Sequence, residues 1–120
     1  MKAWMAAPAL LIALITTNAS ATDGNGLLEA CQNAVQNMDA GRPGGISDGY
    51  CYGVVYGVAS TMLELNLYLK KSEQTCFPEG FRNDQSARVV ADYLKAHPAS
   101  LHRDAAFLAM AAFQSTYPCK

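Results

Sequence analysis

The residues with the greatest capacity for chemistry are four cysteines: Cys31, Cys51, Cys76 and Cys119. A thiol enzyme needs a free cysteine that a histidine activates, and no cysteine here stands out from the other three as unpaired. Their number is even, and the start of the chain predicts export to an oxidising compartment, where disulfides persist. We therefore predict two disulfide bonds rather than a nucleophile.

The pairing of these cysteines is not determined by the sequence, because four cysteines allow three pairings. We favour Cys31 with Cys51 and Cys76 with Cys119, since each cysteine then pairs with its neighbour along the chain. By restricting the unfolded chain, the first bond would stabilise the folded state by about 3 kcal/mol and the second by about 4 kcal/mol. A domain of this size buries only about two-thirds of its unfolded surface, so such cross-links would help to stabilise it.

The two histidines and the carboxylates are poorly placed for catalysis or metal binding. His97 and His102 lie on either side of Pro98, and they would face different directions even on one continuous helix. No C-x-x-C or C-x-x-C-H motif is present, and the acidic residues are scattered rather than paired for acid–base work. We interpret His97 as a residue that ends a helix and interacts favourably with the helix dipole. The prediction is a protein that is not an enzyme and has no cofactor and no metal.

The charge of the chain limits its partners. Nine Lys and Arg residues stand against ten Asp and Glu residues, which gives a formal net charge of −1. No basic stripe is available to follow a nucleic acid backbone, and no Lys/Arg-rich amphipathic helix would lie on a membrane surface. The partner is therefore expected to be a protein or a small molecule.

The first 21 residues have the pattern of a cleavable secretory signal peptide. Lys2 precedes an apolar run from Ala3 to Ile15, which a short polar stretch and the motif Ala19-Ser20-Ala21 follow. The run is shorter than the roughly 20 residues that a helix needs to cross a bilayer. We predict a signal peptide over residues 1–21 and a single domain over residues 22–120, located in the bacterial periplasm and without a membrane attachment after cleavage.

Residues 22–120 predict an all-α fold. Apolar residues recur at three- and four-residue steps over about 27–38, 84–97 and 101–116, and residues 50–69 are apolar almost throughout. Residues 22–26 are expected to be a frayed terminus, and two irregular loops separate the first three helices. No segment alternates as a strand would. The expected architecture is a small four-helix bundle held by two disulfides.

The second predicted helix is expected to be central and the most buried, because it is apolar on most sides. Ser47 or Asp48 could cap its start. Gly49, Gly53 and Gly57 lie four residues apart and form a ridge that another helix backbone could approach closely. Each glycine costs about 1 kcal/mol relative to alanine, so we expect the ridge to be packed, either at a helix crossing inside the domain or at a subunit interface.

A more specific pattern lies in the second half of the chain and around the first two cysteines. It consists of Cys76-x-Pro78-x-Gly80, Gln85, Val89-Val90, Tyr93-Leu94, His97-Pro98, Leu101-His102, Pro118-Cys119, and Cys51-x-Gly53 preceded by Cys31. Together these features resemble the Rap/Tai family of immunity proteins over about residues 27–119. One departure is Arg82, which stands where relatives commonly have a threonine that could cap the third helix. Capping is therefore expected from Asn83 or Asp84.

The resemblance implies a function that makes no covalent bond. Members of the family are periplasmic helical proteins, often homodimers, that occlude the cleft of peptidoglycan amidase effectors delivered by type VI secretion systems. For this chain, the resemblance implies an amidase effector as the protein partner and allows a homodimer.

The predicted contact surface is the loop over residues 72–84. An exposed aromatic residue flanked by charges makes a good interface anchor, and this loop offers Glu73, Glu79, Phe81 and Arg82. Two alternatives remain open. Phe77 and Phe81 could instead pack under the bundle, and the glycine-rich loop around Arg42 could serve as the contact.

Two other functions compete with immunity. A periplasmic chaperone-like adaptor would bind partners through exposed apolar surface. A small-ligand or lipid carrier would need a cavity, for which the candidate lining is Met62, Leu65, Leu69, Leu108 and Phe113.

Overall fold

The computed structural model describes residues 22–120, and the signal peptide predicted for residues 1–21 lies outside this range. Four α-helices make up the fold: α1 (Gly24–Asp39), α2 (Ile46–Leu65), α3 (Asn83–Ala96) and α4 (Ala105–Thr116). Two short 3₁₀ helices, η1 (Lys71–Glu73) and η2 (Pro98–Ser100), lie in the connections. The described residues contain no strand longer than an isolated bridge, so the predicted all-α four-helix bundle is confirmed.

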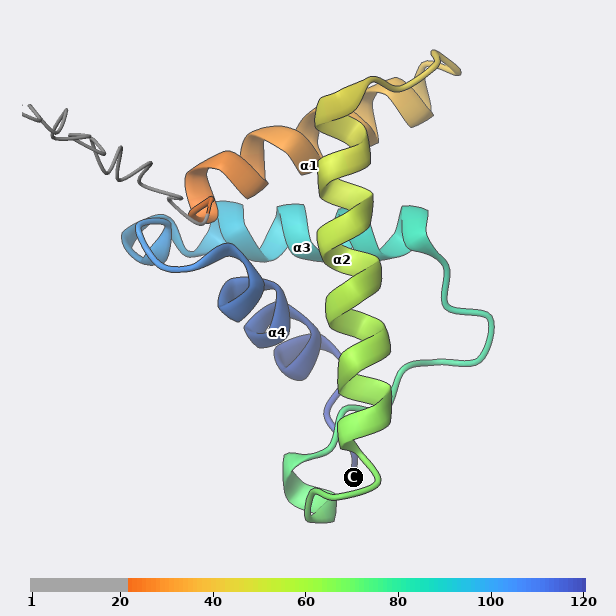
Figure 1. Ribbon diagram of the computed structural model, residues 1–120, viewed down its shortest axis with the longest axis vertical. Coiled ribbons are helices and arrows are strands. Elements are labelled where there is room, and N and C mark those ends of the chain that lie inside the picture. The colour runs from red at the N-terminus through yellow and green to blue at the C-terminus, as the bar shows by residue number, and fades with distance from the viewer. Residues whose placement is uncertain (1–21) are drawn as a thin grey trace, which may run out of the picture.

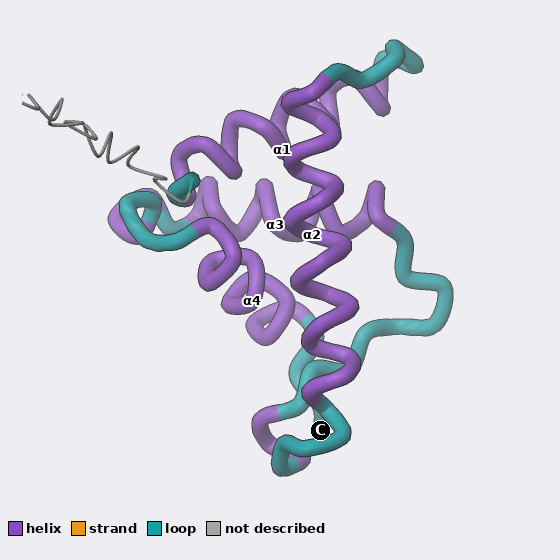
Figure 2. Tube along the Cα trace, viewed as in Figure 1, coloured by secondary structure: helices purple, strands orange, loops and turns teal. Residues whose placement is uncertain are grey.

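The helices pack around one core. In Figure 1, α1 and α3 lie side by side, α2 crosses both of them, and α4 occupies the angle between α3 and α2. The long connection from α2 to α3 forms the lower end of the molecule together with the C-terminus, as the teal segments of Figure 2 show. Within residues 22–120, no helix is both long and apolar enough to span a bilayer.

The core is formed by the inner faces of all four helices. Its largest fully buried side chains are Leu27, Val55, Val90, Leu94, Leu108 and Phe113. Cys31 and Cys51 are also fully buried and join α1 to α2 through a disulfide, with their Cα atoms 5.0 Å apart. The second disulfide joins Cys76 to Cys119. The favoured pairing of the cysteines is therefore confirmed.

The first residues of the domain are ordered, and the expectation of a frayed terminus is wrong. The Asp23 side chain caps α1 by accepting hydrogen bonds from the backbone N–H groups of Asn25 and Gly26, at 3.0 and 3.2 Å. The N–H of Gly24 donates to the carbonyl oxygen of Arg103. A Cβ atom at Gly24 would lie only 2.4 Å from Leu108. Glycine is needed here because the start of α1 packs closely on the start of α4.

The second helix differs from its prediction in two ways. Only one face of α2 is buried, through Asp48, Cys51, Val55, Ala59 and Met62, whereas the opposite face is exposed to solvent. A Cβ atom built on any of the three ridge glycines, Gly49, Gly53 and Gly57, would meet nothing within 4 Å. The expected helix crossing inside the domain is therefore wrong, and the ridge lies open.

The start of α2 also lacks the expected side-chain cap. Gly45 occupies the capping position and makes no side-chain hydrogen bond. The buried Asp48 carboxylate instead accepts a hydrogen bond of 2.8 Å from the amide of Asn37 on α1. Asp48 therefore ties two helices together rather than capping one.

Candidate partner-binding surface

The lower end of the molecule is built from the α2–α3 connection and the C-terminal segment. Thr75 and Pro118 form an isolated antiparallel bridge, and the N–H of Cys76 donates to the carbonyl oxygen of Tyr117 at 2.8 Å. The Cys76–Cys119 disulfide joins the same two segments. The connection is therefore fixed to the end of the chain at several neighbouring points.

The aromatic residues of the predicted contact loop lie inward. Phe77 and Phe81 are half-buried and pack on each other with ring centroids 4.8 Å apart. Phe77 also meets Phe113 edge-on at 5.3 Å, and Phe81 meets Tyr117 at 5.4 Å. This geometry favours the alternative in which both rings pack under the bundle. A partner contact at Phe81 stays a prediction.

The charged residues predicted for the contact do not form one cluster. Glu73, Glu79 and Arg82 are exposed on the α2–α3 connection, whereas Arg42 lies in the α1–α2 loop at the opposite end of α2 (Figure 1). The Arg82 guanidinium pairs with the carboxylate of Asp84 at 2.7 Å. Their role in binding also stays a prediction.

The start of α3 corrects the expected capping. The helix begins at Asn83 and its capping residue is Arg82, which makes no side-chain hydrogen bond to the helix. The expectation that Asn83 or Asp84 would cap it is wrong, because both residues already lie within the helix. At the other end, His97 directly follows the last residue of α3 and is its C-cap, so the helix ends where predicted. Its Nδ1 lies 2.7 Å from the carbonyl oxygen of Tyr93.

One exposed group was missed by sequence reasoning. Helix α2 ends at Leu65, and the following turn exposes Leu67 and Tyr68 by 76% and 84%, with Leu65 and Leu69 partly exposed beside them. We call residues 65–71 the tip. The prediction assigned residues up to 69 to a buried helix because they are apolar. The polar Asn66 and the adjacent Lys70 and Lys71 were the signals of an earlier helix end.

Two side chains, Asn66 within the tip and Gln74 after it, join the tip to the connection that follows. The Asn66 amide donates to the carbonyl oxygen of Thr75 at 2.7 Å and accepts from its N–H at 3.0 Å. The Gln74 amide donates to the carbonyl oxygens of Asn66 and Leu69 at 3.0 and 2.9 Å. Because Thr75 is only 2% exposed, its two bonds to Asn66 are partly shielded from water, and the four bonds together fix the turn.

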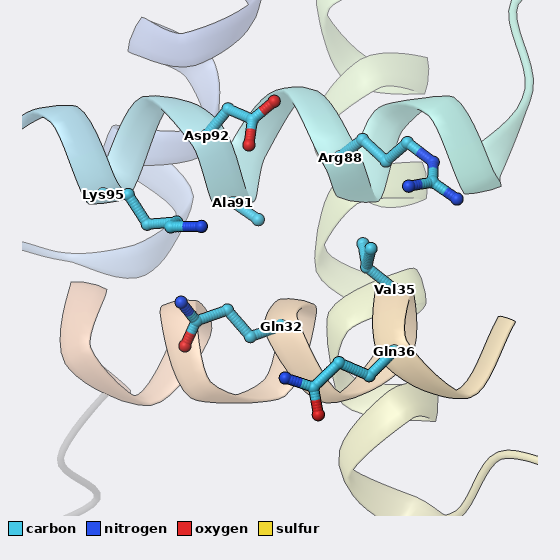
Figure 3. A pocket seen from close by; sticks show the side chains of 7 residues that line it. All are labelled: Gln32, Val35, Gln36, Arg88, Ala91, Asp92 and Lys95. Carbon is cyan, nitrogen blue, oxygen red and sulfur yellow. The ribbon is translucent and has the colours of Figure 1, made fainter. Parts of the chain in front are cut away.

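Two shallow hollows lie elsewhere on the surface. The first, of about 180 Å³, lies between α1 and α3. Figure 3 shows Gln32 and Gln36 of α1 across from Asp92 and Lys95 of α3. Near it, Arg88 pairs with Asp39 at the end of α1, which lowers the pKa of that carboxyl group. The second hollow, of about 210 Å³, lies between α2 and α4 and is lined by Gly57, Val58, Thr61, Met62, Ala106 and Met110.

The predicted carrier cavity is not formed by its candidate residues. Leu108 and Phe113 are buried in the core, whereas Leu65 and Leu69 are exposed at the tip. Both hollows are also smaller than the roughly 300–1,000 Å³ of typical ligand pockets. The five residues therefore do not surround a shared space.

The described residues offer neither a free thiol nor a cluster of side chains that could hold a metal ion. All four cysteines are in disulfides, so no thiol is available as a nucleophile in this state. Residues 22–120 contain no group of three or more His, Cys, Asp or Glu residues placed to hold a metal ion. Exposed apolar side chains on a rigid frame are suited to contacting another protein.

Comparison with known proteins identifies the family of the chain. The family model described as Rap1a immunity proteins matches residues 23–119. This range includes all four helices and both disulfides, and it confirms the resemblance found from the cysteines and the His97-Pro98 segment. No curated protein and no solved structure shows a significant match.

Proposed function

The chain belongs to the family of Rap1a immunity proteins, and we propose that it protects the cell that makes it from a peptidoglycan amidase delivered by a type VI secretion system. It acts in the periplasm by covering the cleft of the amidase, so that peptidoglycan stem peptides cannot enter. The observation that carries this proposal is the family match over nearly all of the described domain.

The construction of the domain supports inhibition by binding. A surface that is already rigid loses little conformational entropy when it meets its partner, and two disulfides hold this domain at its core and at its lower end. Disulfides persist in oxidising compartments such as the periplasm. Both features suit an inhibitor that must remain folded outside the cytoplasm.

The test begins with the neighbouring reading frame, which we expect to encode a peptidoglycan amidase. The protein, exported with its own leader and purified from the periplasm, should form a tight complex with that amidase and stop its digestion of purified sacculi. Cells that send the amidase to their periplasm should survive when they make the full chain and die when residues 1–21 are deleted. Undiminished digestion at saturating inhibitor, or digestion of sacculi by this protein alone, would contradict the proposal.

The competing function is a chaperone-like adaptor, which the exposed Leu67 and Tyr68 favour. An adaptor would bind many unfolded proteins with similar affinity. Preventing the aggregation of reduced, unfolded model substrates while ignoring the amidase would select the adaptor. Specific binding of the amidase would select immunity.

We also propose that two copies pair through the outer face of α2. This face carries the open glycine ridge together with Tyr56 and Leu63, which are 60% and 52% exposed. If two helices cross antiparallel at Gly53, their backbones approach closely and their dipoles oppose each other favourably.

Sedimentation velocity over a range of concentrations tests the dimer. Gly53→Leu should abolish it without harming the monomer, because a Cβ at this position meets nothing within 4 Å and leucine favours a helix by about 0.8 kcal/mol or more over glycine. Ala96→Leu, an equally bulky change on the exposed end of α3, should leave the dimer intact. A wild-type protein that stays monomeric at every concentration would overturn this arrangement.

A further inference from the structure

We infer that the tip, residues 65–71, is the element that enters the amidase cleft, with Tyr68 and Leu67 as its anchors. This inference rests on the proposed immunity function and identifies the surface that performs it. It replaces the aromatic anchor expected at Phe81, which packs against Phe77 and Tyr117.

The first reason is that neighbouring aromatic residues are treated in opposite ways. Phe77 and Phe81 are folded against Phe113 of α4, while Tyr68, in the same connection, is left 84% exposed beside a 76% exposed Leu67. The fold therefore has an apolar cluster at this end of the molecule, and the tip side chains are turned away from it. Their exposure contributes nothing to the stability of the domain.

The second reason is the rigidity of the turn that presents them. Asn66 and Gln74 make four hydrogen bonds to backbone groups of the tip and of Thr75. The next residue, Cys76, is covalently fixed to the C-terminal segment. A turn held in this way loses little entropy on binding, and tyrosine provides a large, rigid contact with a polar hydroxyl at its end.

The shape and charge of the tip indicate the chemistry of the surface that receives it. The tip projects past the last turn of α2 at the lower end of the molecule (Figure 1), so its complement is concave. Lys70 and Lys71 are exposed directly beside Tyr68, whereas the Glu73 carboxylate accepts a hydrogen bond from the N–H of Lys70 within the tip. The receiving cleft therefore has apolar walls, a hydrogen-bond acceptor for the tyrosine hydroxyl, and carboxylates along its rim.

The experiment measures the affinity of exported, purified variants for the amidase encoded by the neighbouring reading frame. Tyr68→Ser and Leu67→Ser should each weaken binding about 30-fold or more, as expected for interface anchors, and should relieve inhibition of sacculus digestion in parallel. Phe107→Ser is the matched control, because Phe107 is also an exposed aromatic residue but lies on α4. It should change the affinity less than about twofold.

Charge provides an independent readout. Replacing Lys70 and Lys71 together by glutamate should slow association about tenfold at low salt, and the difference should shrink at high salt, since exposed charges act mainly on the rate of encounter. Dissociation should change little. Thermal midpoints and intact disulfides establish that each variant is folded.

The outcomes separate this inference from the function on which it rests. If the wild-type protein inhibits the amidase and both tip variants inhibit it equally well, the tip is not the docking element although immunity stands. If the wild-type protein does not bind the amidase, both proposals fail together. If Phe107→Ser weakens binding as much as Tyr68→Ser, the contact is not confined to the tip and the inference is overturned.

Discussion

The two disulfides of this protein join regions of opposite character. Cys31 and Cys51 are fully buried between α1 and α2, within a core that also includes Leu27 and Val55. Cys76 is exposed, and its bond to Cys119 holds two irregular segments that share few buried side chains. The first bond therefore reinforces helices that packing already holds, whereas the second supplements the partial packing of the lower end.

This difference explains how one small domain can be both stable and well presented to a partner. Burial of apolar surface stabilises the helices, and a cross-link adds to that stability by restricting the unfolded chain. The aromatic side chains of the lower end, Phe77, Phe81 and Tyr117, are only partly buried, so a covalent bond and the hydrogen bonds of Asn66 help to fix its shape. Exposed apolar side chains can then be displayed without collapsing inward.

The largest expected contrast is in the rate of reduction. Dithiothreitol should reduce Cys76–Cys119 in the native protein at least about a thousandfold faster than Cys31–Cys51, because the buried bond becomes accessible only when the domain unfolds, at a cost of about 5–15 kcal/mol. Rapid alkylation followed by mass spectrometry measures both rates. Similar rates for the two bonds would show that the core opens as readily as the lower end.

Removal of the bonds by mutation should also have unequal effects on stability. Cys31→Ala with Cys51→Ala should lower the free energy of unfolding by about 4 kcal/mol, of which about 3 comes from loop closure and the rest from lost packing. Cys76→Ala with Cys119→Ala should lower it by only about 2 kcal/mol, since the tail can detach while the core stays folded.

Denaturation in guanidinium chloride measures both losses. Loop length alone predicts the reverse order, because the outer bond spans 43 residues and the inner bond spans 20. A larger loss for the outer pair would mean that the lower end unfolds together with the core.

A loss similar to that of the outer disulfide is expected from Asn66→Ala. The change leaves the N–H of the buried Thr75 without its partner, which costs about 2 kcal/mol. Hydrogen exchange should show faster exchange at residues 66–76 and little change in α1. Ser72→Ala, an exposed change in the same connection, is the control. Faster exchange throughout the domain would show that the tip and the core unfold as one unit.

The smallest effect concerns the ion pair between Asp39 and Arg88, which joins α1 to α3 in the helical part of the molecule. Arg88 lowers the pKa of the Asp39 carboxyl group below its usual 3.8. The contribution of the ion pair to stability is therefore present above about pH 4 and is lost as the pH falls through the lowered pKa of Asp39. Asp39→Asn should reduce the urea midpoint slightly at pH 7 and not at pH 2, because exposed pairs contribute little. An equal effect at both values would remove the ion pair as its cause.

Sequence patterns predicted the helical framework better than the surfaces. The apolar periodicity of α1 and α3 placed both helices to within a few residues, because each buries one stripe and exposes the other. The start of α4 was placed too early. Asp104 caps that helix by accepting from the N–H of Phe107, and residues 101–103 before it form a turn that follows η2. Nothing in the periodicity distinguishes such a turn from the first turn of a helix.

The errors about α2 and the tip have one cause. Apolar residues were taken to be buried, which holds for Val55 and Met62 but not for Tyr56, Leu63 or Tyr68. Apolar character predicts burial against something, but it does not reveal whether that surface belongs to the same chain or to a partner. The residues proposed to bind other molecules are therefore the ones whose burial was predicted wrongly.

The position of Cys119 sets the order in which the molecule is completed. The Cys31–Cys51 bond can close once α1 and the first turns of α2 have emerged, whereas its counterpart must wait for a cysteine that follows α4. Disulfide formation takes seconds or longer, so a newly exported chain passes through a stage in which its helices are assembled and its lower end is still loose. Maturation of the protein thus finishes at the tip, and an oxidase that acts late in biogenesis would decide when the molecule is ready for use.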